Sequence, residues 1–315
     1  MLKIAHHTRQ AIANILHGKD HRLVVIVGPC SIHNAQSALQ YAKNLRKQIE
    51  KHHATLCIVM RTYVEKARSR GGWKGFVNDP DLNNTNDILK GLSQATLLLQ
   101  EINTLGVPCA MEIVNPFTAH YFVPYLSWAA IGARTVESQI HREIASILPL
   151  PIGFKNTTGG DIQAAIDGAE IASQPHHFLG IDSTGKLSVQ HSSGNPNTHI
   201  VLRGSKQASN YDVNTVQNLR TCVMIDCSHG NSQKDPAQQI RVAEALALRM
   251  AEGETSIFGI MLESHLIAGK QVWSSNQAPH PNQSITDACI GWEETEKALD
   301  QLAQAVLARR ECVVS

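Results

Sequence analysis

The chain has 315 residues, of which 43% are hydrophobic and 17% are charged, and its formal net charge at pH 7 is +1. This is the composition of an ordinary globular protein, and the length is sufficient to bury a large hydrophobic core. A charge this close to zero gives no reason to expect binding to nucleic acid or to a membrane surface. No apolar run approaches the roughly 18 residues that a membrane-spanning helix requires, so no membrane association is expected.

Seven cysteines are scattered along the chain, and no Cys-x-x-Cys pair occurs. An odd number without regular spacing argues against a disulfide framework and favours a reducing compartment. Residues 1–20 are polar and contain several histidines, which is not the pattern of a signal peptide. We therefore expect a cytoplasmic protein.

Short segments rich in β-branched residues alternate with longer segments of helical periodicity. The expected strands, in chain order, are residues 23–27, 56–60, 109–113, 128–131, 152–154, 177–181, 199–202, 222–225 and 257–262. A short helix is expected near the N-terminus. Further helices are expected where apolar residues recur every three or four positions, for example at 35–49, which follows the candidate N-cap Asn34, and at 92–102, 240–250 and 299–306.

Repeated strand–helix units predict a parallel sheet. About eight such units over about 300 residues favour a closed (β/α)8 barrel over two nucleotide-binding halves. No Gly-x-Gly-x-x-Gly motif follows the first strand, which supports the barrel. We expect one catalytic domain over residues 1–315, with a long loop at 62–86 and a polar excursion at 182–197 that forms a loop within the domain.

Positively charged side chains stand at the ends of several expected strands. The residues in question are Arg61, Arg134, Lys155 and Arg203. In a (β/α)8 barrel the carboxyl ends of the strands meet on one face, where active sites lie. Neighbouring cations repel each other unless an anion lies between them, and arginine binds phosphate and carboxylate through paired hydrogen bonds. The pattern therefore indicates a site for an anionic substrate.

A second group of strand-end residues offers ligands for a metal ion. It consists of Cys30, His229, Glu263 and Asp287. Thiolate, imidazole and carboxylate together suit a borderline transition metal such as Mn, Fe, Co or Zn. Taken singly, however, a cysteine after a strand is most often a small core residue, and a lone histidine or arginine is most often a loop residue. The residue types alone leave both interpretations of this group open.

Several segments in order resemble the microbial type I 3-deoxy-D-arabino-heptulosonate-7-phosphate (DAHP) synthases. They are Gly28-Pro29-Cys30-Ser31-Ile32-His33, Met60-Arg61-Thr62-Tyr63-Val64-Glu65-Lys66-Ala67-Arg68-Ser69, Gly132-Ala133-Arg134-Thr135-Val136-Glu137-Ser138-Gln139, Gly153-Phe154-Lys155-Asn156, Leu202-Arg203-Gly204, Asp226-Cys227-Ser228-His229-Gly230-Asn231-Ser232, Glu263-Ser264-His265-Leu266 and Ser284-Ile285-Thr286-Asp287-Ala288-Cys289-Ile290-Gly291-Trp292. Each motif alone is weak, but the ordered set is specific and covers residues 7–310.

The resemblance implies the first step of the shikimate pathway, in which phosphoenolpyruvate condenses with erythrose 4-phosphate and phosphate is released. It implies that a divalent metal is bound by Cys30, His229, Glu263 and Asp287. It also implies that phosphoenolpyruvate is held by Arg134, Lys155 and Arg203 together with Arg61 and Lys66. The aldose phosphate would be held by Arg68 and Ser69. Glu112 corresponds to a family carboxylate near the attacking water, and Lys66 or Lys155 would supply a proton to the new alkoxide.

Two departures from the family pattern bear on specificity and regulation. Where the family usually has Lys-Pro-Arg-Thr, this chain has Lys66-Ala67-Arg68-Ser69, and an alanine after the lysine resembles related synthases that use arabinose 5-phosphate. The segment that precedes the match is short, and residues 115–125 differ from the usual pattern. We therefore expect an enzyme insensitive to Phe, Tyr and Trp. A homo-oligomer, either a dimer or a tetramer, is also expected.

Three rival interpretations remain from the sequence. The same chemistry on another aldose phosphate is the nearest one. A non-catalytic barrel with a regulatory role is disfavoured, because every expected ligand and anion contact is present. A metal-dependent aldolase that does not use phosphoenolpyruvate is also disfavoured, because its nucleophile would not require four cations.

Overall fold

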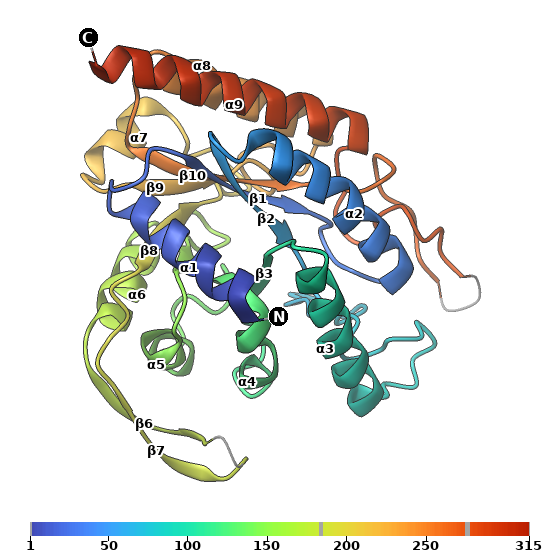
Figure 1. Cartoon of the computed structure of the whole chain (residues 1–315). Helices are drawn as coiled ribbons and strands as arrows, with labels where there is room; N and C mark the ends of the chain where they lie inside the picture. The colour runs from blue at the N-terminus through green and yellow to red at the C-terminus, as the bar shows by residue number, and fades with distance from the viewer. Residues whose placement is uncertain (1, 183–184, 275–277, 315) are drawn as a thin grey trace.

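Eight parallel strands close into a barrel in the computed structural model, which describes residues 2–182, 185–274 and 278–314. The order around the barrel is β1-β10-β9-β8-β5-β4-β3-β2 (Figure 1). The strands are β1 (Leu23–Gly28), β2 (Leu56–Arg61), β3 (Cys109–Glu112), β4 (Leu126–Ile131), β5 (Ile152–Lys155), β8 (Thr198–Leu202), β9 (Val223–Asp226) and β10 (Ile257–Glu263). The predicted (β/α)8 barrel is confirmed.

Helices cover the outside of the barrel, with α8 and α9 side by side (Figure 1). They are α1 (Leu2–Leu16), α2 (Ala35–His52), α3 (Ile88–Thr104), α4 (Ala119–Phe122), the 3-10 helix η1 (Val123–Tyr125), α5 (Gln139–Ile147), α6 (Gln163–Ser173), α7 (Val213–Asn218), α8 (Pro236–Ala251) and α9 (Trp292–Val314). Asn34 is the N-cap of α2, as predicted, because its side chain accepts a hydrogen bond from the Ser37 amide at 2.9 Å. Asp87 and Asp235 cap α3 and α8 in the same way.

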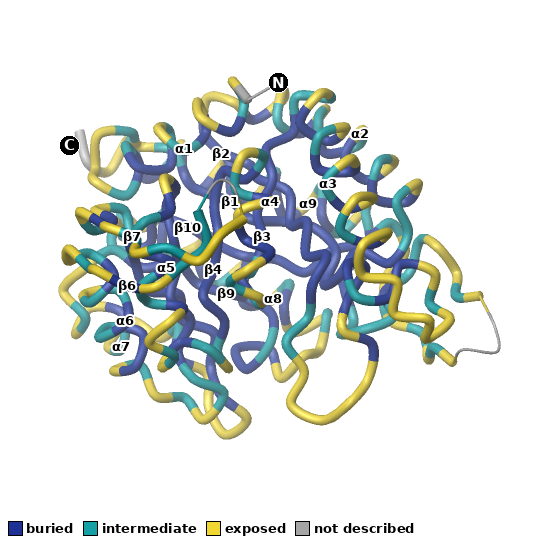
Figure 2. The backbone as a smooth tube through the Cα atoms, turned by 90° about the horizontal axis from the view of Figure 1, so that it is seen from below, coloured by how far each residue is buried: buried dark blue, intermediate teal, exposed yellow. Residues whose placement is uncertain are grey.

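The strands are buried because both of their faces pack against apolar side chains. β1, β2, β4 and β10 are buried over their whole length, as expected for parallel strands covered by helices (Figure 2). Side chains on their outer faces form a core with the surrounding helices. A second set fills the inside of the barrel, so the barrel is a solid support rather than a channel.

The N-terminal helix closes the amino end of the barrel. α1 contacts β1, β2 and β4, and its Ile12 and Ile15 join the cluster inside the barrel. Arg9 donates a hydrogen bond to the Leu126 carbonyl oxygen at 2.8 Å, which ties the helix to the start of β4. The expected N-terminal helix is therefore present, and it leaves the carboxyl ends of the strands uncovered for a site.

The polar excursion differs from its prediction. Residues 177–181 do not join the barrel, and the excursion is not a simple loop. Instead β6 (His176–Ile181) pairs antiparallel with β7 (Leu187–Ser192) in a hairpin that extends away from the barrel (Figure 1). The alternation of Leu187, Val189 and His191 with polar residues is the period of a strand, but the polar residues around it hid this signal. Residues 183 and 184 of the excursion lie outside the described residues.

The long loop after β2 is confirmed, and it is anchored at its base. The Lys66 amide donates to the Lys74 carbonyl oxygen at 2.9 Å, and the Val77 amide donates to Val64 at 3.1 Å. Gly75 has a φ of 114°, and a Cβ there would lie 2.5 Å from the Val64 carbonyl oxygen. Only glycine fits this position, so the loop returns over its own start and holds Lys66 near the barrel.

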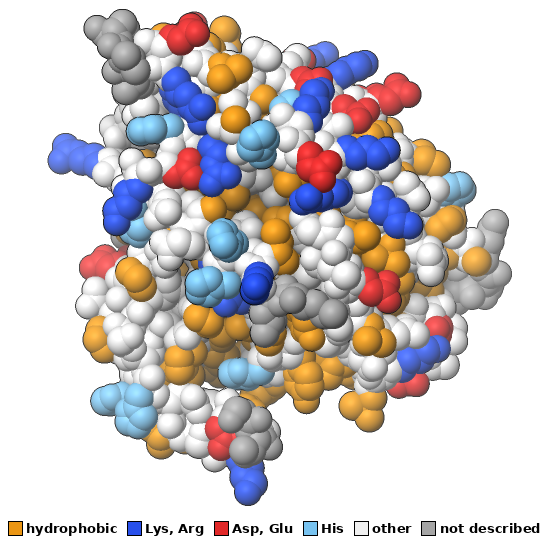
Figure 3. Space-filling model, in the orientation of Figure 1, with side chains coloured by type: hydrophobic (Ala, Val, Ile, Leu, Met, Phe, Trp, Pro, Cys, Tyr) orange, Lys and Arg blue, Asp and Glu red, His pale blue; other side chains and the backbone are white. Residues whose placement is uncertain are grey.

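Acidic and basic side chains are interspersed on the face of the molecule seen in Figure 3, in agreement with the near-zero net charge. Across the described part of the chain, no helix combines the length and the apolar character needed to cross a bilayer.

We expect acid to destabilise the fold through His199, which lies on β8 inside the barrel. The Trp128 indole donates to His199 Nε2 at 3.0 Å, and burial lowers the pKa of this imidazole to about 4. In the unfolded chain the pKa is about 6.5. Between these two values the unfolded state binds more protons, so stability falls with falling pH, by up to about 3 kcal/mol.

The measurement is urea unfolding of the wild type and His199→Gln at about pH 7.5 and about pH 4.5. Glutamine still accepts from Trp128 but does not titrate, so this variant should lose less unfolding free energy on acidification. The exposed His120→Gln variant should behave like the wild type. An equal loss in all three proteins would contradict the assignment to His199.

Candidate active site

A cavity of about 570 Å³ opens at the carboxyl ends of the strands. Among its lining residues are eight lysines and arginines: Arg61, Lys66, Arg68, Arg70, Arg134, Arg203, Lys206 and Lys234. The carboxylates in the same lining are Glu112 and Asp287. A protein with a formal net charge of +1 thus concentrates eight of its 28 lysines and arginines around one cavity, which is costly unless anions enter it. Lys206, Lys234 and Arg70 were not predicted, because they stand neither at the end of an expected strand nor at a position to which the family resemblance assigns a role.

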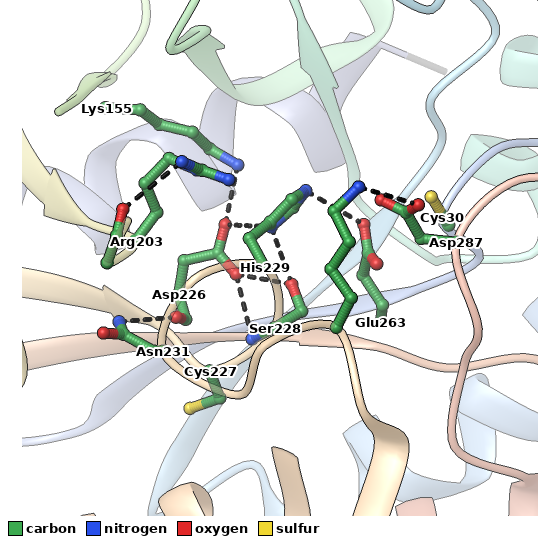
Figure 4. Close-up of polar contacts among 12 residues, drawn as sticks. Cys30, Lys155, Arg203, Asp226, Cys227, Ser228, His229, Asn231, Glu263 and Asp287 are labelled. Carbon is green, nitrogen blue, oxygen red and sulfur yellow. Dashed lines mark hydrogen bonds and ion pairs between the residues drawn. The ribbon is translucent and has the colours of Figure 1, made fainter. Parts of the chain in front are cut away.

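Three of the four predicted metal ligands come together beside this cavity. One ligand atom each from Cys30, Glu263 and Asp287 lies within 4.8 Å of the others. Glu263 ends β10, whereas Cys30 and Asp287 stand on the loops after β1 and before α9. His229 is not part of this mutually close set, but its Nε2 lies 3.6 Å from Glu263 Oε1. Its ring points toward Glu263 (Figure 4).

A basic side chain lies beside each of the three mutually close donors. Lys66 Nζ lies 3.0 Å from the Cys30 carbonyl oxygen and 3.3 Å from Cys30 Sγ. Arg61 Nη2 lies 3.0 Å from Glu263 Oε1 in a fully buried pair. Lys234 Nζ lies 3.0 Å from Asp287 Oδ1. The donor set and the cation cluster are therefore one continuous site.

The donor set fits a divalent transition metal. A thiol, two carboxylates and a nearby imidazole are the ligand types that such ions accept. Burial raises the pKa of the Cys30 thiol, and Glu263 adds to this effect, so a metal would have to displace its proton. Burial alone would raise the pKa of Asp287, but His229 and Lys66 outweigh it and lower the pKa to about 2. This carboxylate is therefore ionised and ready to bind a cation.

Asp226 organises two of the predicted site residues. It ends β9 and is fully buried, and its Oδ2 lies 2.8 Å from Lys155 Nζ and 3.0 Å from His229 Nδ1 (Figure 4). Its Oδ1 accepts from the Ser228 hydroxyl at 2.5 Å. Burial would raise the pKa of Asp226, but His229 and Lys155 hold it well below its usual range.

The position of Asp226 decides which nitrogen of His229 is available. Because Nδ1 lies 3.0 Å from this carboxylate, Nε2 is the nitrogen that faces Glu263 and that could bind a metal. The sequence placed Asp226 at a strand end, next to His229, but assigned it no role. The sequence signal for Asp226 is the Asp-x-x-His spacing, because it places a carboxylate three residues before the candidate ligand His229.

The other predicted anion contacts lie along the cavity wall. Arg134 Nε donates to Ser69 Oγ at 2.6 Å, which brings the long loop after β2 against the loop after β4. Arg203 is 8% exposed, and its backbone amide donates to Asn156 Oδ1 at 2.7 Å. Arg68 lines the cavity near its mouth, where its side chain is exposed.

Glu112 enters the cavity from the end of β3, and a glycine makes room for it. A Cβ on Gly132 would lie 2.0 Å from Glu112 Oε1, so any larger residue would displace this carboxylate. Apart from Lys155, the residues predicted from the sequence line this cavity or contact residues that line it. Lys155 is joined to the cavity lining through Asp226, which contacts both Lys155 and His229. The arrangement can hold two anions next to a metal ion.

Comparison with known proteins agrees with this geometry. The sequence profile of the DAHP synthetase I family matches residues 3–300. The phospho-2-dehydro-3-deoxyheptonate aldolase of Haemophilus influenzae is 45% identical, over 96% of this chain and 86% of that protein. The Phe-sensitive phospho-2-dehydro-3-deoxyheptonate aldolase of Escherichia coli is 46% identical, over 96% of this chain and 89% of that protein.

A solved structure gives the same result. The phospho-2-dehydro-3-deoxyheptonate aldolase from Francisella tularensis superposes with a TM-score of 0.94 at 46% identity, over 98% of this chain and 93% of that one. The chain therefore belongs to the DAHP synthetase I family, and the predicted enzyme class, a 3-deoxy-7-phosphoheptulonate synthase, is confirmed.

Proposed function

We propose that this cavity joins phosphoenolpyruvate to erythrose 4-phosphate, forming DAHP and releasing phosphate, in a reaction that depends on a divalent metal. The observation that carries the proposal is the concentration of basic side chains directly beside Cys30, Glu263 and Asp287. Both substrates are anions, and a cavity of about 570 Å³ has room for both. Mn, Fe, Co and Zn all suit the donor set.

The basic residues divide between the two substrates. Arg134, Lys155 and Arg203, with Arg61 and Lys66, hold the carboxylate and phosphate of phosphoenolpyruvate. Arg68 and Ser69 hold the phosphate of the aldose nearer the cavity mouth. Binding both anions in one orientation turns an encounter between molecules into a fixed geometry, which is a large part of the rate enhancement.

The bond-forming step joins the enol carbon to the aldehyde carbon. A bound divalent metal supplies Lewis-acid polarisation of the aldehyde oxygen. Positive charge then develops at the carbon that bears the phosphate ester, and water adds there with loss of a proton, with Glu112 as the nearby carboxylate. The resulting hemiketal phosphate breaks its C–O bond to phosphate, which leaves the ketone of the product. Of the two lysines that can protonate the new alkoxide, we favour Lys66, because its Nζ lies beside the donor set, whereas Lys155 is paired with Asp226.

The proposal predicts metal-dependent consumption of phosphoenolpyruvate with erythrose 4-phosphate. The assay follows the absorbance of phosphoenolpyruvate with Mn²⁺ and again with EDTA, and arabinose 5-phosphate is tested in parallel. Loss of phosphoenolpyruvate only with the four-carbon sugar, abolished by EDTA, is the expected result. Activity with the five-carbon sugar alone would favour the alternative acceptor, in agreement with Ala67 in the cavity lining. Inactivity with both sugars would contradict the proposal.

Asp226→Asn should weaken metal binding by about 10- to 100-fold, because the carboxylate that orients His229 is lost. The measurement is the free Mn²⁺ signal in electron paramagnetic resonance during a titration, with circular dichroism to verify the fold. Asp212→Asn is the matched control, since Asp212 caps α7 outside the cavity lining and asparagine also caps helices. Unchanged Mn²⁺ affinity in a folded Asp226→Asn protein would show that Asp226 does not orient the ligand.

The expected insensitivity to aromatic amino acids stays a prediction. Relatives of this chain carry names such as Phe-sensitive, Trp-sensitive and tyrosine-inhibited, so the family includes enzymes of each kind. We expect no loss of activity with millimolar Phe, Tyr or Trp in the assay above. Strong inhibition by any one of them would refute the prediction. The homo-oligomer also stays a prediction.

A further inference from the structure

The hydroxyl group of Tyr63 is buried and has no hydrogen-bond partner among the residues that the structure describes. Tyr63 stands two positions after Arg61 and is 1% exposed. Buried polar groups are nearly always paired, so a buried hydroxyl without a partner requires an explanation. Neither the sequence motifs nor the roles proposed above assign one to this side chain.

The ring of Tyr63 has a fixed position. It packs in the cluster that fills the inside of the barrel, together with Ala110, Trp128 and Met224. The guanidinium group of Arg61 lies 3.9 Å from the ring centroid on its face, within the range of a cation–π contact. The hydroxyl is therefore held by rigid neighbours at the top of the barrel interior.

Tyr63 also lines the cavity, in the same lining as Arg61, Lys66 and Glu112. Arg61 shows a second unpaired donor, because its buried Nη1 has no partner in the described structure, while its Nη2 is bound to Glu263. Two buried donors on stacked side chains are thus unpaired beside a cavity that concentrates positive charge. A bound anion would pair both of them.

The phenol is suited to donate rather than to carry a charge. Burial raises its pKa, and Glu112 and Asp226 raise it further, against the opposite effect of Arg61. The hydroxyl therefore stays protonated at neutral pH. A neutral hydroxyl donor can orient an anion that the surrounding cations attract, because its O–H bond points to one acceptor oxygen.

We propose that Tyr63 donates a hydrogen bond to an anionic oxygen of phosphoenolpyruvate and is thus a further substrate-binding residue. The inference rests on the proposed function. It implies that the unpaired hydroxyl is kept for substrate binding at the expense of the stability of the free protein. A variant that lacks only this oxygen should therefore bind phosphoenolpyruvate more weakly, while its substrate-free form should be at least as stable as the wild type.

Tyr63→Phe is that variant. We expect its affinity for phosphoenolpyruvate, measured by calorimetry with Mn²⁺ and without the aldose, to fall by about 10- to 100-fold, as for loss of a hydrogen bond to a charged group. The kcat/KM for phosphoenolpyruvate should fall to the same extent, while the KM for the aldose phosphate is unchanged. The thermal midpoint of the substrate-free variant should equal or exceed that of the wild type.

Tyr41→Phe is the matched control. Tyr41 is equally buried, but its hydroxyl donates to Ser264 Oγ at 2.9 Å and it is not among the cavity-lining residues. This variant should lose thermal stability and keep its phosphoenolpyruvate affinity, the reverse of Tyr63→Phe. A Tyr63→Phe protein with affinity and kcat/KM within about twofold of the wild type would overturn the inference.

Failure of the proposed function would look different. In that case the wild type itself would neither bind phosphoenolpyruvate nor consume it with either sugar. A wild type that binds and reacts, together with an unaffected Tyr63→Phe variant, would refute only the role of Tyr63. A Tyr63→Phe protein that loses both thermal stability and affinity for both substrates would indicate a structural role instead.

Discussion

The site depends on two buried ion pairs at the carboxyl end of the barrel. Lys155 and Asp226 are paired with 3% and 0% of their side chains exposed, and Arg61 and Glu263 are paired at 0% and 2%. Removing one partner of such a pair leaves an uncompensated buried charge and typically costs about 3–5 kcal/mol. Apolar residues of similar volume in place of such a buried ion pair often leave the folding free energy unchanged or more favourable. Stability alone therefore does not account for these two ion pairs. Each of them also holds a side chain in place beside the site for substrates or metal.

The fold supplies the rigidity that this arrangement requires. Apolar side chains fill the inside of the barrel, and α1 closes its amino end, so packed side chains support the strands from within. The charged residues stand where the filled interior stops. Tyr63 marks this boundary, since it belongs to the apolar cluster inside the barrel and also lines the cavity. The site is thus built from strand ends, from the shorter loops that follow them, and from the long loop after β2, whose close turn requires Gly75.

Sequence periodicity predicted the barrel well because buried parallel strands are short, apolar and regularly spaced. It failed at β7, where one face of a projecting hairpin is exposed and polar residues conceal the alternation. Strand-end position found Arg61 and Glu263, whose places are fixed by the barrel, whereas the role of Glu112 came only from the family resemblance. It missed Lys234, because a loop residue that pairs with Asp287 has no positional signature in the sequence. It also gave Asp226 no role, because a pairing with Lys155, 71 positions away, is visible only after folding.

The cation cluster and the metal donors form one site, and crystals grown with Mn²⁺ and phosphoenolpyruvate test this most directly. Anomalous scattering should place one Mn²⁺ in contact with Cys30, Glu263 and Asp287, and His229 should complete the set. Phosphoenolpyruvate should lie beside it within the basic cavity. A metal bound elsewhere, or phosphoenolpyruvate bound outside this cavity, would show that the donors and the basic residues do not form one site.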